Sequence, residues 1–133
     1  MEKIIEPSQG RAEAPARSPG SQRSGPARHG ITRDREYFQP IAFLVRSLSD
    51  ENRLRILRCI SGGKRSVTSI VEELNLSQPL VSHHLRELKR SLLVKIERNG
   101  PFNYYELSDA RILDIIQCLN TLANDLLSAE NSS

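Results

Sequence analysis

The sequence predicts a mostly α-helical domain that carries one small β-hairpin. Apolar residues recur at helical spacing in five segments between residues 36 and 127. Two β-prone runs, LVKIER and FNYYEL, flank Asn99-Gly100-Pro101, a combination typical of a hairpin turn. With 133 residues, the chain has the length of one domain of about 100 residues and a tail.

Residues 1–33 are expected to form a disordered, weakly basic tail. They hold six basic and three acidic side chains among many Pro, Ser and Gly residues, with almost nothing apolar to bury. Residues 34–133 are the predicted folded domain. No apolar run approaches the ~20 residues that span a bilayer, and MEKIIEPSQG lacks the apolar stretch of a signal peptide. We therefore expect no membrane partner, a cytoplasmic location and no disulfide scaffold from the two cysteines.

Two amphipathic helices are predicted first. One extends from Glu36 to Leu48, and Pro40 belongs in its first turn or at its start, because an interior proline removes a backbone hydrogen bond. Ser49 is the expected N-cap of the next helix, which has acidic residues in its first turn and ends at Gly62-Gly63.

A helix-turn-helix unit is predicted next. Ser66 is the expected N-cap of a short third helix, and Asn75 can adopt the left-handed conformation that ends it. Ser77 caps a fourth helix almost at once, and this helix extends to about Arg90. Two short helices joined by so short a turn form a helix-turn-helix. With the hairpin and a last helix from Asp109, the plan is a winged helix-turn-helix.

The fourth helix is predicted to have a core face and a reading face. Its core face falls within an arc of roughly 100° and comprises Val81, His84, Leu85, Leu88 and Leu92. The opposite face suits a helix that reads base edges in the major groove. Base contacts are expected from Gln78, Leu80, Ser82 and His83, and phosphate contacts from Arg86 and Arg90.

Charge is distributed unevenly along the predicted domain. Residues 50–100 carry a net charge of +4, from 10 basic and 6 acidic groups, whereas residues 101–133 carry −4. This separation favours a polyanionic partner for the region that contains the fourth helix. A polar helix face is more often merely solvated, but the tight turn, the N-cap and the hairpin favour DNA.

The last helix carries an apolar stripe that is longer than a lone helix needs. Its members are Ile112, Ile116, Leu119, Leu122 and Leu126. Two copies that pair through this stripe would cover it and would read a palindrome as a two-fold dimer. The alternative is that the stripe packs only on its own domain.

Three segments carry a resemblance to a known family: LSDENRLRIL at 48–57, LSQPLVSHHLREL at 76–88 and YYELSD at 104–109. Together they resemble the ArsR/SmtB family of bacterial winged-helix repressors, over residues 38 to 128. The resemblance implies a homodimer built on the first and last helices and repression that a small inducer lifts. It places the reading-helix positions on Ser77, Gln78, Leu80, Ser82, His83 and Arg86, with Ser77 expected to contact phosphate.

Two residues depart from the family pattern. Leu80 stands where many members have Thr, which removes a hydroxyl and alters the expected operator. Pro101 stands where many members have Arg after the wing glycine. The wing is therefore expected to contact phosphates through Lys95 and Arg98.

The sequence does not match the family's known metal sites. The third helix, SVTSIVEEL, has no thiol and the last helix has no histidine, so neither a metal nor another cofactor is expected. Cys59 and Cys118 lie in the two helices that bear the thiols of the family's persulfide and oxidant sensors, although not at the sensors' positions. Free cysteine most often acts as a small buried hydrophobe. An inert pair of cysteines is therefore favoured over a thiol switch. The expected inducer is a small molecule or an oxidant.

The leading hypothesis is a dimeric, sequence-specific DNA-binding repressor. Its expected partners are double-stranded DNA with an inverted-repeat operator and a second copy of the chain. The alternative is a winged helix that serves as a protein–protein interaction module, because folds are reused for different functions. No enzyme is expected, since the sequence shows no phosphate-cradling glycine loop, metal motif or supported acid–base pair.

Overall fold

A computed structural model describes residues 27–132, with side chains from Arg33 onwards. Most of the predicted tail therefore lies outside the described residues. The elements are, in chain order, α2 (Ala27–Ser47), α3 (Glu51–Ile60), β1 (Arg65–Ser66), α4 (Val67–Leu74), α5 (Gln78–Arg90), β2 (Val94–Asn99), β3 (Phe102–Leu107) and α6 (Arg111–Ser132). The chain divides into two compact units at Ile41, and the winged helix-turn-helix belongs to the unit that begins at Ala42.

Helix α2 is longer than predicted. It begins at Ala27 rather than Glu36, so residues 27–33 are helical and do not belong to a disordered tail. The prediction was wrong because ARHGITRDR lacks the apolar periodicity on which it relied. Pro40 consequently lies inside the helix and not in its first turn. There it can donate no hydrogen bond to the carbonyl of Glu36.

Helix α3 has a different N-cap from the one predicted. Asp50 is the cap, because its carboxylate accepts a hydrogen bond from the backbone N–H of Arg53 at 3.1 Å. Ser49 instead donates its hydroxyl to the carbonyl oxygen of Arg46 at 2.7 Å. Asp and Ser are equally good caps, so residue preference alone could not distinguish these two adjacent positions.

The predicted helix-turn-helix is confirmed in its details. The hydroxyls of Ser66 and Ser77 cap α4 and α5, accepting from the backbone N–H groups of Ser69 and Leu80 at 3.2 and 3.3 Å. Asn75 ends α4 in the left-handed conformation, with φ 54° and ψ 47°. The turn is therefore fixed at both ends by its own residues.

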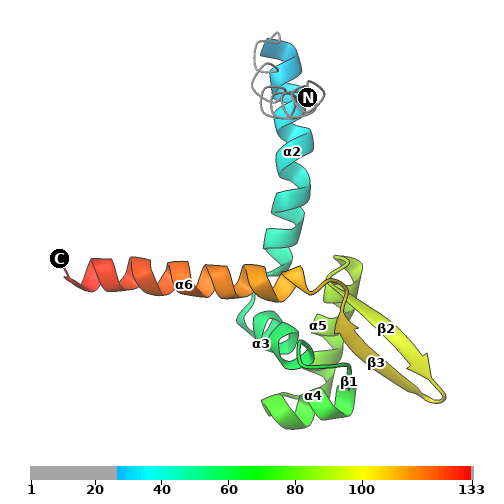
Figure 1. The fold of residues 1–133 in the computed structure, drawn as a ribbon. Coiled ribbons are helices and arrows are strands. Elements are labelled where there is room, and N and C mark those ends of the chain that lie inside the picture. The colour runs from blue at the N-terminus through cyan, green and yellow to red at the C-terminus, as the bar shows by residue number, and fades with distance from the viewer. Residues whose placement is uncertain (1–26, 133) are drawn as a thin grey trace, which may run out of the picture. The chain divides into compact units, whose positions relative to one another are not determined.

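The predicted hairpin is present and gains a third strand. Asn99 pairs with Phe102, so the turn residues are Gly100 and Pro101. Gly100 has φ 64°, the positive angle that the first turn residue of a type II′ turn requires. Strand β1 pairs with β3, giving the order β1-β3-β2. Figure 1 shows β2 and β3 as the long hairpin beside α5. Sequence alone could not reveal β1, because two residues are too few to show alternation.

The core of this unit lies between α3, α4, α5 and the start of the hairpin. Its fully buried side chains are Ile56, Leu57, Ile60, Ile70, Val81, Leu85 and Leu88. Leu92, which was predicted to lie in the core, is 74% exposed. It follows the end of α5 with φ 69°, and Leu93 is buried in its place.

Among the described helices, none combines the length and apolar character needed to cross a membrane.

Candidate nucleic-acid interface

Helix α5 presents two faces of opposite character, as predicted. Val81, Leu85 and Leu88 are buried against α3, α4 and β2. Pro79 occupies the first turn, where a missing N–H costs nothing. The N-cap Ser77 then fixes where the exposed face begins.

The predicted reading residues gather on the exposed part of α5. Gln78 and His83 are exposed, whereas Leu80 and Ser82 are half-buried. Amide, hydroxyl and imidazole groups therefore lie towards the N-terminal half of the helix, where a recognition helix contacts base edges. The geometry is compatible with all four predicted base contacts.

Two arginines follow on the same helix, and their surroundings differ. Arg86 is exposed, and its side chain has no hydrogen-bond or ion-pair partner among the described residues. Arg90 is paired with Glu87, at 3.2 Å between Nη1 and Oε2. Arg90 must weaken this pair to bind phosphate, so Arg86 is the better placed of the two.

A buried histidine fixes α5 to α3, and sequence reasoning did not identify this contact. His84 is only 5% exposed, and its Nδ1 accepts a hydrogen bond from Nε of Arg53 at 3.3 Å. Its Nε2 lies 3.7 Å from Oδ1 of Asp50, the N-cap of α3. The sequence did place His84 among core residues, but no residue pattern identifies a partner 31 positions away.

This network shifts the pKa values of its members. Burial lowers the pKa of His84, and the positive charge of Arg53 acts in the same direction, whereas Asp50 opposes it. Burial acts to raise the pKa of Asp50, but the backbone N–H of Arg53 and the proximity of His84 outweigh it, so that pKa is lowered. The neutral imidazole and the ionised carboxylate are therefore both favoured.

The wing's predicted cations lie on opposite faces of the hairpin. Lys95 pairs in register with Glu106 and Arg98 with Asn103, and positions three apart on a strand point to opposite sides. Both side chains are exposed. A single DNA backbone that passes one face of the hairpin would therefore meet one of them directly.

The apolar stripe of α6 is divided in the structure. Ile112 is buried in the core of its own chain, with only 8% exposure, so its assignment to a dimer interface was wrong. Ile116 packs partly against the same core. Leu119, Leu122 and Leu126 are at least half exposed, as is Ile115, which the prediction omitted. The available stripe thus runs from Ile115 to Leu126.

The two cysteines have contrasting environments. Cys59 is buried, and burial raises the pKa of its thiol, with the Glu73 carboxylate acting in the same direction. Cys118 is exposed on α6. A raised pKa reduces the thiolate fraction, so Cys59 is poorly suited to react.

Within the part of the chain that the structure describes, no group of three or more His, Cys, Asp or Glu residues could hold a metal ion.

Comparison with known proteins gives concordant matches. A family profile described as "Bacterial regulatory protein, arsR family" matches residues 50–95. An uncharacterized HTH-type transcriptional regulator of Methanocaldococcus jannaschii is 34% identical over 88 residues, 65% of this chain and 99% of that protein. The arsenical resistance operon repressor of Staphylococcus aureus is 34% identical over 85 residues, 64% of this chain and 82% of that repressor.

The fold is also found among solved structures. The homodimeric winged helix-turn-helix DNA-binding domain of a possible ArsR-family regulator from Mycobacterium bovis matches with a TM-score of 0.63 and 24% identity. The match covers 70% of this chain and 86% of that domain. The predicted fold class is confirmed by this likeness.

Proposed function

The chain belongs to the ArsR family of bacterial regulatory proteins, and from this we propose that it represses transcription as a homodimer bound to an inverted-repeat operator. ArsR-family regulators bind DNA and form homodimers. They are transcriptional regulators and not enzymes, in agreement with the sequence prediction. The interaction-module alternative has no observation in its favour.

The exposed face of α5 carries the proposal. It presents Gln78, Ser82 and His83 ahead of the unpaired Arg86, on a helix whose other face is buried in the core. Hydrogen-bonding groups before a cation match base reading followed by phosphate contact. We assign base contacts to Gln78, Leu80, Ser82 and His83. Phosphate contacts are assigned to Ser77, Arg86, Arg90, Lys95 and Arg98.

Dimerisation is assigned to the exposed stripe of α6. Leu119, Leu122 and Leu126 present a row of apolar side chains that the single chain leaves uncovered. A two-fold pair through this row would place two α5 helices on half-sites about one helical turn of DNA apart. Release by a small inducer fits the family.

The test is selection of random duplex DNA by the full chain, followed by sequencing of the bound fraction. We expect an enriched inverted repeat whose affinity falls steeply with salt, because phosphate contacts release counterions. Enrichment of a single unrepeated site would contradict the dimer. No enrichment at moderate salt would contradict sequence-specific regulation.

A further inference from the structure

A groove lies between α3 and α6, outside the proposed DNA interface. Its volume is about 490 Å³, within the range of small-molecule sites. Leu54, Leu113 and Ile116 supply apolar lining, and Arg55, Arg58 and Gln117 supply polar groups. Such a mixture suits a ligand that has an apolar body and a polar end.

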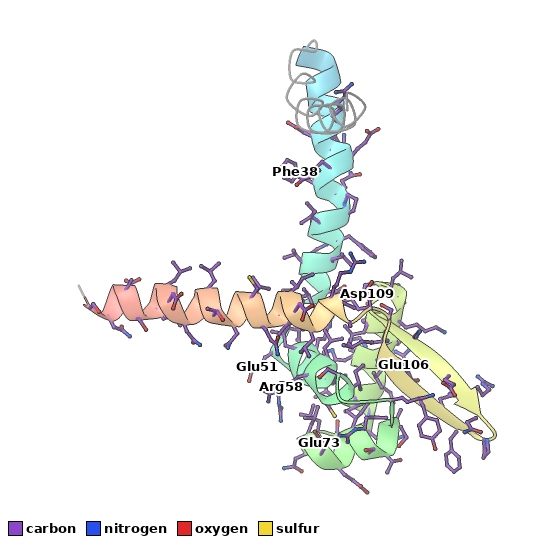
Figure 2. The ribbon with its side chains drawn as sticks, viewed as in Figure 1. Phe38, Glu51, Arg58, Glu73, Glu106 and Asp109 are labelled. Atoms are coloured by element: carbon purple, nitrogen blue, oxygen red, sulfur yellow. The ribbon has the colours of Figure 1, made fainter. Side chains whose placement is uncertain are left out.

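The charge of the groove favours an anion. Arg58 is exposed, and its side chain has no hydrogen-bond or ion-pair partner among the described residues. Glu51 is the carboxylate among the lining residues, so two guanidinium groups face one negative charge. Figure 2 shows Glu51 and Arg58 on the same side of α3, below α6 in the view. Guanidinium groups bind carboxylates with two parallel hydrogen bonds.

Arg55 connects this groove to the helix-turn-helix. Its Nη2 donates to the carbonyl oxygen of Leu74 at 3.0 Å, and its Nη1 donates to Oδ1 of Asn52 at 3.2 Å. Leu74 is the last residue of α4, directly before the left-handed Asn75, and the α5 cap Ser77 follows two residues after that. A terminal helix carbonyl needs a partner, and Arg55 supplies it. An anion that draws Arg55 away would therefore loosen the turn that positions α5.

The groove and the proposed dimer stripe use different sides of α6. At 100° per residue, Leu113, Gln117 and Asn120 lie roughly 150° around the helix from Leu119, Leu122 and Leu126. Pairing through the leucines therefore leaves the groove side of the helix free. A ligand and a second copy can occupy α6 together.

We propose that the α3–α6 groove binds a small amphipathic organic anion, a carboxylate on an apolar body, and that binding weakens operator affinity by competing for Arg55. The effect on operator affinity rests on the proposed function, whereas the anion site itself does not.

The anion site is tested with octanoate, titrated into the full chain without DNA and followed by calorimetry. 1-Octanol has the same chain length without the charge. We expect octanoate to bind at least about tenfold more tightly than octanol, and Arg58→Gln to remove most of that difference. Arg111→Gln, which removes one positive charge elsewhere, should leave it unchanged. Equal binding of both probes, no binding of octanoate at millimolar concentration, or indifference to Arg58→Gln would each overturn the site.

The effect of anion binding on operator affinity is tested on the selected operator by fluorescence anisotropy. Octanoate should lower operator affinity of the wild-type chain and have little effect on Arg58→Gln. Octanoate binding with unchanged operator affinity would overturn the coupling through Arg55. A chain that binds no DNA at all would refute the proposed function, while the titration without DNA would still decide the anion site.

Discussion

Arg53 on α3 donates a hydrogen bond from Nε to Nδ1 of His84 on α5, across 3.3 Å in the interior of the domain. Because Nδ1 accepts, the ring proton belongs on Nε2, which faces Asp50 at 3.7 Å. Arg53 also donates from Nη1 to the carbonyl oxygen of Ser47 at 3.5 Å, at the end of α2. One arginine thus connects the proposed reading helix to the segment before α3.

This contact makes stability depend on pH. Burial holds the pKa of His84 below its ordinary value of 6.5. Below 6.5 the unfolded chain binds a proton that the folded chain does not. The free energy of unfolding should therefore decrease as the pH is lowered from 6.5, until the pH passes below the folded-state pKa. The slope should reach at most about 1.4 kcal/mol per pH unit. Urea unfolding on either side of pH 6.5 measures it.

Two variants assign this pH effect to a residue. His84→Gln keeps an acceptor for Arg53 but cannot bind the proton, so it should flatten the slope near pH 6. His83→Gln, at the exposed neighbouring position, should retain the slope. A slope that persists in His84→Gln and disappears in His83→Gln would contradict the assignment.

The reading face predicts two distinct DNA-binding defects. His83→Ala should weaken operator binding by about 1–3 kcal/mol while random DNA is bound almost as before, because a base contact is lost. Arg86→Gln should weaken binding to both DNAs and lower the salt slope by about 1. Arg90→Ala should act like Arg86→Gln but less strongly, since Glu87 already neutralises part of its charge.

Arg111→Gln is the matched control for these measurements. It removes an equal charge from the start of α6, where Arg111 pairs with Asp109 at 2.9 Å. Filter binding over a range of salt concentrations would give all the affinities and slopes. Equal losses on operator and random DNA for His83→Ala would contradict its base contact.

The helix-turn-helix and the hairpin were predictable because their signals are local. Caps at Ser66 and Ser77, the left-handed Asn75 and the Gly100 turn each follow from residue type and neighbours. The errors over Ile112 and Leu92 came instead from how distant parts of the chain pack. The core already accommodates Ile112, and chain reversal after α5 exposes Leu92, and neither follows from a periodic pattern.

The same distinction applies to the candidate site. Exposed residues of α5 could be predicted from helical geometry. The anchor between Arg53 and His84 could not, because it joins residues far apart in sequence. The contact from Arg55 to Leu74 and the groove beside it were also beyond prediction, since both depend on how α3 packs against α4 and α6.

The α6 stripe predicts a monomerising substitution. Leu122 is 52% exposed in the single chain, so Leu122→Asp should leave the monomer folded while placing a charge in the proposed interface. Size-exclusion chromatography with light scattering should show the mass falling from dimer to monomer. Asn124→Asp adds the same side chain on another side of α6 and should remain dimeric. A dimer that survives Leu122→Asp would place the interface elsewhere.

The cysteines should react at very different rates. With a disulfide reagent at neutral pH, Cys118 should react quickly and Cys59 only as fast as the domain opens, because Cys59 is buried and its pKa is raised. The chromophore released by the reagent measures both phases. Cys118→Ser should remove the fast phase. Two fast phases in the native protein would restore the thiol-switch hypothesis.

The turn of the helix-turn-helix predicts an unusual response at Asn75. Its φ of 54° is a conformation that costs a residue with a β-carbon about 1 kcal/mol, less for Asn than for most. Asn75→Ala should therefore destabilise the domain by about 1 kcal/mol, and Asn75→Gly should be neutral or stabilising. Urea unfolding midpoints decide this, and equal destabilisation by Ala and Gly would indicate a lost side-chain contact instead.

Ser66 has two structural duties, since it caps α4 and pairs with Tyr104 in the sheet. Lys64, two residues earlier, pairs with Glu97 on the other strand of the wing. The hairpin and the helix-turn-helix are thereby held in a fixed relative position by one short segment. Each copy of the domain would then contact a half-site of one fixed length. Operators with different spacings between half-sites would have to be accommodated at the interface between the two copies.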